Sequence, residues 1–170
     1  MPPTLRPATR ADIPLILEFI QGLADYEKLT HEVEATAARL ERTLFPTGRV
    51  EPGAADAGVS APAAHCVLAF AGETPAGFAL YFFNYSTFLA RPGLYLEDLF
   101  VTPEFRGAGI GRALLLHLAK IANARDCGRM EWTVLDWNRS AIEFYESLGA
   151  RRMPEWQVCR LTGAALAQYA

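Results

Sequence analysis

The sequence is poor in residues that form covalent or metal cross-links. Its 170 residues include only three cysteines and three histidines. Cys66, Cys127 and Cys159 are far apart and lack the spacing of metal ligands, and the histidines at positions 31, 65 and 117 are equally scattered. This pattern argues against a disulfide-stapled secreted domain and against a metal centre. We expect each cysteine to be a small buried thiol, in a protein of a reducing compartment.

Long apolar runs and an excess of positive charge are also missing. The best apolar run, residues 13–20, is too short to cross a bilayer and contains Glu18. The first residues lack the charged-then-apolar pattern of a signal peptide. Lys and Arg number 16 against 19 Asp and Glu, and this net charge of -3 gives no basic footprint for nucleic acid. We expect a cytoplasmic protein whose partners include neither a membrane nor a nucleic acid.

The rest of the composition is that of a globular chain, with 51% hydrophobic and 21% charged residues, and its length suits one domain over residues 1–170. Hydrophobic periodicity predicts one mixed α/β domain. Strands are expected at 5–8, 65–71, 76–85, 93–101, 130–135, 151–153 and 157–161. Helices are expected at 13–26, at 34–44, from the glycines at 107–111 to about residue 126, and at 139–148. Thr162 is expected to cap a last helical turn. Residues 45–64 have no periodicity and are expected to form a loop.

The most informative segment is 94–111, an apolar strand with two carboxylates followed by a turn and three alternating glycines that open a helix. Backbone amides and a helix N-terminus meet there, which suits an anion such as a pyrophosphate, and Arg106 adds a positive charge. A P-loop needs Lys and then Ser or Thr after its glycine, but Arg112 follows Gly111. A dinucleotide fingerprint needs glycine three positions after Gly109, where Arg112 again stands. A glycine turn without a ligand remains the alternative.

The surviving pattern, Arg106-x-x-Gly109-x-Gly111, resembles the acetyl-CoA signature of the GNAT family of N-acetyltransferases. The segments 23–27, 95–98, 136–138 and 144–150 resemble the diamine branch of that family, which includes spermidine/spermine and thialysine enzymes. The resemblance implies a single-domain GNAT-like α/β fold, with a mixed, mostly antiparallel sheet flanked by helices. It also implies strands that splay at a bulge to form a slot for acetyl-CoA, and a homodimer without a metal.

By resemblance, acetyl-CoA is the donor and is bound by the end of the strand and by the glycine loop. The implied binding residues are Leu99, Phe100, Val101, Arg106, Gly107, Ala108, Gly109, Ile110, Gly111, Arg112 and Asn138. A missing Cβ lets glycine amides approach phosphate oxygens closely. Asn138 is also a good helix N-cap on its own, and the two roles are compatible.

Acetyl transfer to an amine needs a base for the nitrogen and an acid for the departing thiolate. Strand alternation predicts Tyr95, Glu97, Leu99 and Val101 on one face and Leu96, Asp98 and Phe100 on the other. The resemblance favours Glu97 as the base, through a water molecule, and Tyr145 as the general acid. For Glu97 the alternative is a purely structural carboxylate. For Asp98 a structural role and a role on the substrate side both stay open. For Tyr145 the alternative is a core tyrosine.

In the related branch a tyrosine–glutamate pair after the first helix lines the acceptor site. Tyr26 and Glu27 match it and are predicted, together with Glu97, to bind the substrate; a solvated helix end is the alternative. Ser86 stands where the spermidine/spermine enzymes carry an aspartate, which resembles the thialysine-type members and argues against spermine. The prediction is acetylation of a primary amine of a small molecule, by direct attack in a ternary complex. Acetylation of a protein or peptide amine and a non-catalytic CoA sensor are the alternatives.

Overall fold

The computed structural model describes residues 2–47 and 61–170, so most of the loop predicted at 45–64 lies outside the described residues. The chain forms two compact units, Met1–Trp132 and Thr133–Ala170, which are described separately. No helix in the described ranges is both long enough and apolar enough to cross a membrane.

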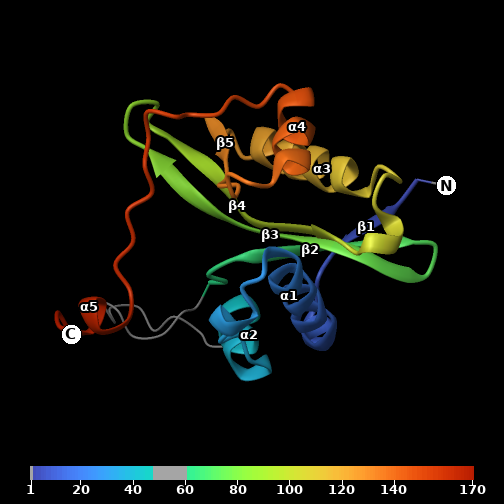
Figure 1. Cartoon of the computed structure of the whole chain (residues 1–170), viewed down its shortest axis with the longest axis horizontal. Helices are drawn as coiled ribbons and strands as arrows, with labels where there is room; N and C mark the ends of the chain where they lie inside the picture. Colours follow the sequence, from blue (N-terminus) through green and yellow to red (C-terminus); the bar gives the residue numbers. More distant parts are fainter. Residues whose placement is uncertain (1, 48–60) are drawn as a thin grey trace. The chain divides into compact units, whose positions relative to one another are not determined.

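The described part of the first unit contains a five-stranded sheet in the order β1-β2-β3-β4-β5 (Figure 1). Its strands are β1 (Thr4–Pro7), β2 (His65–Ala71), β3 (Thr74–Ser86), β4 (Arg91–Val101) and β5 (Arg129–Glu131). The first four strands pair antiparallel in sequence order, and β5 runs parallel to β4. Helices α1 (Ile13–Glu27) and α2 (Ala37–Leu44) lie on one face and α3 (Ile110–Ala124) on the other. The predicted sheet, mixed, mostly antiparallel and flanked by helices, is confirmed.

Local sequence signals explain where the helices begin and end. α1 starts with Pro14 in its first turn, where no amide donor is needed, and ends at Lys28 in the left-handed region (φ 62). α2 starts at Ala37 instead of residue 34, because the Thr36 side chain accepts a hydrogen bond from the amide of Arg39 and caps the helix there. α3 ends at Ala124, two residues before the predicted end.

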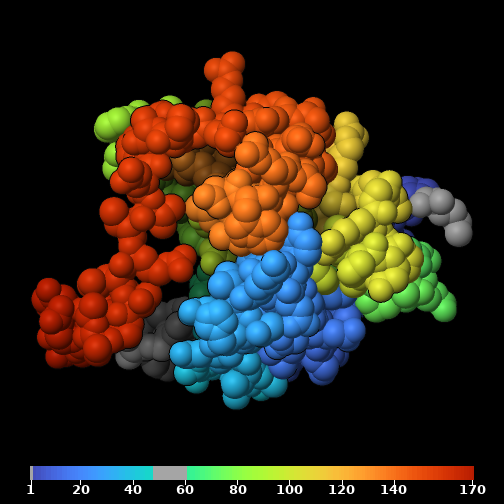
Figure 2. Space-filling model, in the orientation of Figure 1, coloured from blue at the N-terminus to red at the C-terminus, as the bar shows by residue number. Residues whose placement is uncertain are grey.

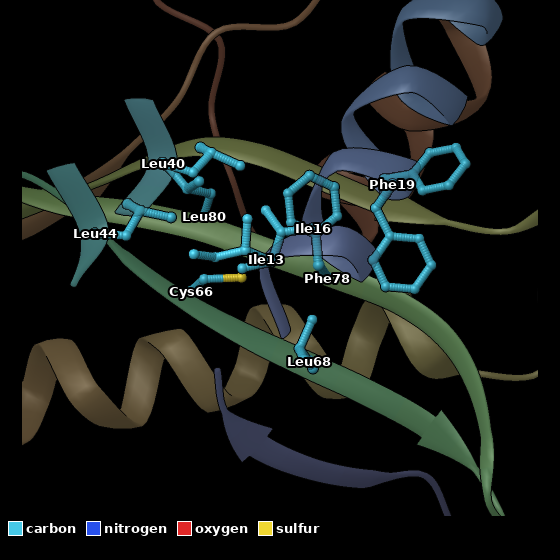
Figure 3. Packing of buried hydrophobic residues seen from close by; sticks show 10 residues of the cluster. Ile13, Ile16, Phe19, Leu40, Leu44, Cys66, Leu68, Phe78 and Leu80 are labelled. Carbon is cyan, nitrogen blue, oxygen red and sulfur yellow. The ribbon is translucent and has the colours of Figure 1, made fainter. Parts of the chain in front are cut away.

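The core on the α1 and α2 face is a cluster of aliphatic and aromatic side chains from both helices, β2, β3 and β4 (Figure 3). Phe19 of α1 stacks on Phe78 with ring centroids 5.6 Å apart and lies 6.1 Å from the ring of Phe100. Cys66 is buried in this cluster, and burial raises the pKa of its thiol to about 12. The predicted buried thiol is therefore confirmed for Cys66. It is wrong for Cys159, which is exposed, and Cys127 is half-buried.

Two glycines permit the close approach of backbones around Phe100. A Cβ at Gly22 of α1 would lie 2.9 Å from Cζ of Phe100, and one at Gly77 of β3 would lie 2.3 Å from the Phe100 carbonyl oxygen. Neither position accepts a side chain without displacing β4 or the Phe100 ring. These contacts fix α1 and β3 against the last residues of β4, immediately before the glycine loop.

The second unit contains α4 (Arg139–Ser147) and α5 (Gly163–Ala167). Asn138 caps α4 as predicted: its Oδ1 accepts a hydrogen bond from the amide of Ala141 at 3.3 Å. The strands predicted at 151–153 and 157–161 are wrong, and the strand predicted at 130–135 ends at Glu131. A strand needs a partner for its backbone groups, and the described residues of this unit provide no sheet edge; Pro154 also removes a donor.

A partly buried ion pair, between Arg6 and Asp12, ties β1 to the entrance of α1. Arg6 donates two hydrogen bonds to the carboxylate of Asp12, at 2.7 and 2.8 Å. The same carboxylate accepts from the amide and the hydroxyl of Thr9, at 2.7 and 2.8 Å, which completes a capping box. The Arg6 guanidinium and the Thr9 donors hold the pKa of Asp12 well below its usual range.

Replacing Asp12 with Asn should lower the free energy of unfolding by about 1.5 kcal/mol at pH 7, because charge-assisted hydrogen bonds are lost. The folded pKa is depressed, so this stability is present above about pH 4, the ordinary pKa of aspartate, and is lost as the pH falls toward the folded value. Urea denaturation of both proteins at pH 7 and pH 3 should therefore show the difference shrinking in acid.

Glu41→Gln is the matched control, because the Arg10–Glu41 pair is about half exposed on both sides. It should change the stability by less than about 0.5 kcal/mol. An equal effect of the two substitutions would contradict this account of Asp12.

Candidate active site

A β-bulge in β4 sets the geometry of the candidate site. Asp98 pairs with Leu80 of β3 and Leu96 pairs with Tyr81, so Glu97 is an extra residue without a cross-strand partner. Such a residue bends the strand and reverses the alternation of side chains beyond it. The structure thus contains a bulge at Glu97, the carboxylate predicted to be the base.

The bulge makes part of the predicted alternation wrong. Tyr95 shares a face with Asp98 and Phe100, because its partner Phe82 lies on the same side of β3 as Leu80 and Phe78. The rings of Phe82 and Tyr95 are 5.1 Å apart, consistent with this pairing. Leu96, by contrast, shares the α3 face with Leu99 and Val101. The reason is the extra residue, which shifts the register by one.

Three carboxylates gather at the bulge. Asp98 points to the face that α1 covers, and burial raises its pKa to about 7, with further contributions from the nearby negative charges of Glu97 and Glu27. Glu27, at the last turn of α1, also has a pKa raised by burial. Glu97 itself is exposed. The structure therefore brings Glu97, the predicted base, and Glu27, the predicted acceptor-site glutamate, into one region. Both are close enough to Asp98 for their charges to raise its pKa.

Arg106 connects the loop to the end of α1. Its Nε donates to the carbonyl of Val101 at 3.1 Å, and its guanidinium lies over the ring of Tyr26, 4.4 Å from the centroid, and 5.9 Å from that of Phe100. Figure 2 agrees: the blue surface of α1 adjoins the yellow surface of the segment after β4. Stacking of this kind favours a cation over an aromatic face. The predicted donor loop and the predicted acceptor residue Tyr26 are thus in contact.

The glycine loop has the form of an anion cradle. Gly107 and Gly109 both have φ +79, and a Cβ at either position would meet no atom within 4 Å, so the loop borders open space. Gly109 is the N-cap of α3. Among the described residues, the amides of Gly107, Gly109 and of the first three residues of α3 donate no backbone hydrogen bond. Free amides at a helix N-terminus fit a pyrophosphate, so these residues suit the group that the sequence predicts.

The edge of β4 beside β5 is free along its second half. Pairing covers Gly93 to Tyr95 against Arg129 to Glu131 and stops there. Within the described residues no strand pairs with this edge from Leu96 to Val101. No described strand therefore pairs with Leu99 and Phe100 on that side, whereas the carbonyl of Val101 accepts the hydrogen bond from Arg106.

Two predicted site residues, Tyr145 and Asn138, belong to the second unit. Tyr145 is half-buried in α4, with its ring 5.2 Å from that of Phe144. Its carbonyl accepts hydrogen bonds from the amides of Leu148 and Ala150. The structure places Tyr145 on the helix that was predicted for it.

Ser86 lies at the other end of the sheet strand from the carboxylates. It pairs with Arg91, six residues before Glu97, which corresponds to about 20 Å along β4. Only 3% of it is exposed, and its hydroxyl accepts from the amide of Leu89 and from Arg129. Ser86 is thus a buried residue at the end of β3, far along the strand from Glu97 and Asp98. The carboxylates therefore say more about the acceptor amine than Ser86 does.

Sequence reasoning missed the bulge and the contact between Arg106 and Tyr26. A signal for the bulge was present, because the adjacent carboxylates Glu97 and Asp98 interrupt an apolar strand, where one of the two has to leave the regular alternation. No sequence signal marks the cation–π contact, because it depends on how α1 crosses β4.

A strand, a bulge with carboxylates and an anion cradle define a site for group transfer from a phosphate-bearing donor. Residues 27–150 match the acetyltransferase (GNAT) family. The chain belongs to this family and is an acetyl-CoA-dependent N-acetyltransferase.

Curated relatives and solved structures agree with this assignment. The chain is 37% identical to L-ornithine N5-acetyltransferase NATA1 of Arabidopsis thaliana, over 95% of the chain and 85% of the relative. It is 34% identical to the thialysine N-epsilon-acetyltransferase of Bos taurus, over 98% of the chain and 96% of the relative. An integron cassette protein of V. cholerae superimposes with a TM-score of 0.75 at 26% identity, over 99% of this chain and 98% of that one.

The shared electrostatics of the carboxylates can be tested directly. Glu27→Gln removes one negative charge near Asp98 and should lower the pKa of Asp98 from its value near 7. Because the folded pKa is raised, protonated Asp98 favours folding at low pH, and that stability is lost as the pH rises through about 7. Carbon-13 NMR of the aspartate carboxyl groups across pH 4 to 9 measures the pKa.

Glu73→Gln, in the exposed turn between β2 and β3, is the control and should leave the pKa of Asp98 unchanged. A wild-type Asp98 that titrates near pH 4 would contradict the burial and the charge coupling described above.

Proposed function

We propose that the protein transfers the acetyl group of acetyl-CoA to a primary amine of a small, cationic molecule, by direct attack in a ternary complex. The observation that carries this proposal is the cluster of Glu27, Glu97 and Asp98 beside the glycine loop and Tyr26. Carboxylates beside an aromatic ring suit an ammonium group. Their position next to an anion cradle suits a reaction between an anionic donor and a cationic acceptor.

The acceptor must lose a proton before it attacks, because alkylamines have a pKa of about 10. In the proposal Glu97 receives this proton, directly or through water, since it is exposed at the bulge where substrate and solvent have access. The nitrogen lone pair then attacks the thioester carbonyl and the bond from carbon to sulfur breaks. Asp98, the half-buried member of the cluster, has a pKa raised to about 7, so it is partly ionised at neutral pH and adds to the negative field that favours the cation.

The departing thiolate needs a proton donor, and we assign this role to Tyr145 by the family resemblance. In the proposal the donor binds at the loop from Arg106 to Arg112, where, among the described residues, the amides of Gly107, Gly109 and the first three residues of α3 donate no backbone hydrogen bond, and at the edge of β4 from Leu99 to Val101. Asn138, the N-cap of α4, completes the proposed donor-binding set.

The names of the curated relatives narrow the acceptor class. Ornithine and thialysine, on which two of those enzymes act by name, are amino acids with a second amino group. We therefore propose a diamine or a lysine-like amino acid as the acceptor, with Glu27 bound to the distal charged group. A homodimer and a cytoplasmic location belong to the same proposal and stay predictions.

Tyr145→Phe should lower kcat by about two orders of magnitude, because the proton donor for the thiolate is removed. Binding of CoA, measured by calorimetry, should be retained. Acetyl transfer is followed by mass spectrometry of the acetylated amine. Phe144→Leu, at the neighbouring ring in α4, is the control for packing and should keep most of the activity. An unchanged rate in Tyr145→Phe would remove this residue from the mechanism.

Glu27→Gln should raise KM about tenfold for ornithine and for a lysine analogue, because their distal charge loses its partner. It should change KM little for a simple monoamine of similar length. A panel of diamines, amino acids and peptides, assayed with both proteins, measures the difference. Activity on peptides alone would favour protein acetylation, and CoA binding without turnover of any amine would favour a sensor.

A further inference from the structure

The side chain of Arg106 contacts a different part of the protein from its backbone. The backbone belongs to the glycine loop, whereas the guanidinium lies 4.4 Å from the centroid of the Tyr26 ring and 5.9 Å from that of Phe100. Its Nε donates to the carbonyl of Val101 at 3.1 Å. Among the described residues, Arg106 forms no ion pair with a carboxylate. These contacts of the side chain join the end of α1 to the end of β4.

The last turn of α1 lies beyond the part of the helix that the core holds. Ala24 is the last buried residue of α1. The turn that follows carries Tyr26 and Glu27, which are both half-buried. It ends at Lys28 in the left-handed region (φ 62), a conformation that is strained for a residue with a Cβ. The stacking of Arg106 on Tyr26 therefore supports a turn that receives little support from the core.

The same turn carries one of the three carboxylates of the site. Glu27 follows Tyr26 directly, and its charge contributes to the raised pKa of Asp98. Because the interaction between charges falls with distance, a shift of this turn would change the field that a cationic acceptor meets. An arginine is suited to hold the turn, because its guanidinium can lie flat on an aromatic ring while an N–H group of the same plane bonds a carbonyl.

We propose that the side chain of Arg106 is a positioning residue for the acceptor, which holds Tyr26 and Glu27 in place to bind a cationic amine. This inference rests on the proposed function, because it takes a cationic molecule as the acceptor. It assigns the side chain of Arg106 to the acceptor side, although the backbone of the same residue belongs to the loop proposed for the donor. One side chain thus ties that loop to the residues that bind the acceptor.

Steady-state kinetics of the full chain, with ornithine and cadaverine as acceptors, test this role. Arg106→Gln should raise KM for both acceptors about tenfold and change kcat less than about threefold, because acceptor binding weakens while the reacting groups remain. Arg106→Lys keeps a cation that can lie over the Tyr26 ring, so its KM should stay within about threefold of the wild-type value. The KM for acetyl-CoA is measured in parallel.

A double-mutant cycle shows whether Arg106 acts through the ring of Tyr26. In a Tyr26→Leu background, Arg106→Gln should change the acceptor KM less than about twofold, because no ring is left to lose its cation. In a Tyr26→Phe background the ring remains, and Arg106→Gln should again raise KM about tenfold.

Arg125→Gln is the matched control, since the Arg125 guanidinium also lies over an aromatic ring, that of Phe83, at 4.5 Å, but at the far end of α3. It should leave KM unchanged, and thermal unfolding of each variant confirms its fold. A rise confined to the KM for acetyl-CoA in Arg106→Gln would overturn the inference, as would equal effects in the Leu and Phe backgrounds; both leave the proposed function intact. A wild type that acetylates neither ornithine nor cadaverine would overturn the proposed function itself.

Discussion

The arrangement of the candidate site depends on one irregularity, the extra residue at Glu97 in β4. Without the bulge, Asp98 would turn toward α3 and Tyr95 would share a face with Glu97. With it, Asp98 lies under α1 with its pKa raised to about 7, and Glu97 is exposed beside it. The two adjacent carboxylates therefore differ in environment although they are neighbours in sequence. One interruption of the pairing separates a solvent-exposed carboxylate, Glu97, from a half-buried carboxyl group, Asp98, that is partly protonated at neutral pH.

The glycine loop brings the two halves of the candidate site together. The carboxylates Glu27 and Asp98 are close to each other in the first unit, on the side of α1. The loop connects the end of β4, which carries Asp98, to the start of α3. Carboxylates beside an amide cradle suit an enzyme that has to bring an anionic donor to a cationic acceptor.

Elements with local signals could be predicted from the sequence, and elements that depend on a distant partner could not. The apolar periodicity and Pro14 predict α1, and Asn138 predicts the start of α4, because capping and amphipathicity act within one helix. The strands predicted at 151–153 and 157–161 failed, since β-propensity says nothing about whether a sheet edge is available.

The same rule holds for the candidate site. The loop at Arg106 and its glycines could be predicted, because the residues that form the cradle follow one another in the chain. The bulge and the stacking of Arg106 on Tyr26 could not, because register and helix crossing are settled by side chains far away in sequence.

Gly22 and Phe100 form a single packing unit, and this has a consequence for the glycine loop. The ring of Phe100 occupies the space that a side chain at position 22 would need, and the same ring lies 5.9 Å from the guanidinium of Arg106. A side chain at position 22 therefore requires a smaller residue at position 100, and Arg106 would then lose one of its aromatic neighbours. A substitution at Gly22 in the core is thus coupled, through one aromatic ring, to the arginine of the glycine loop.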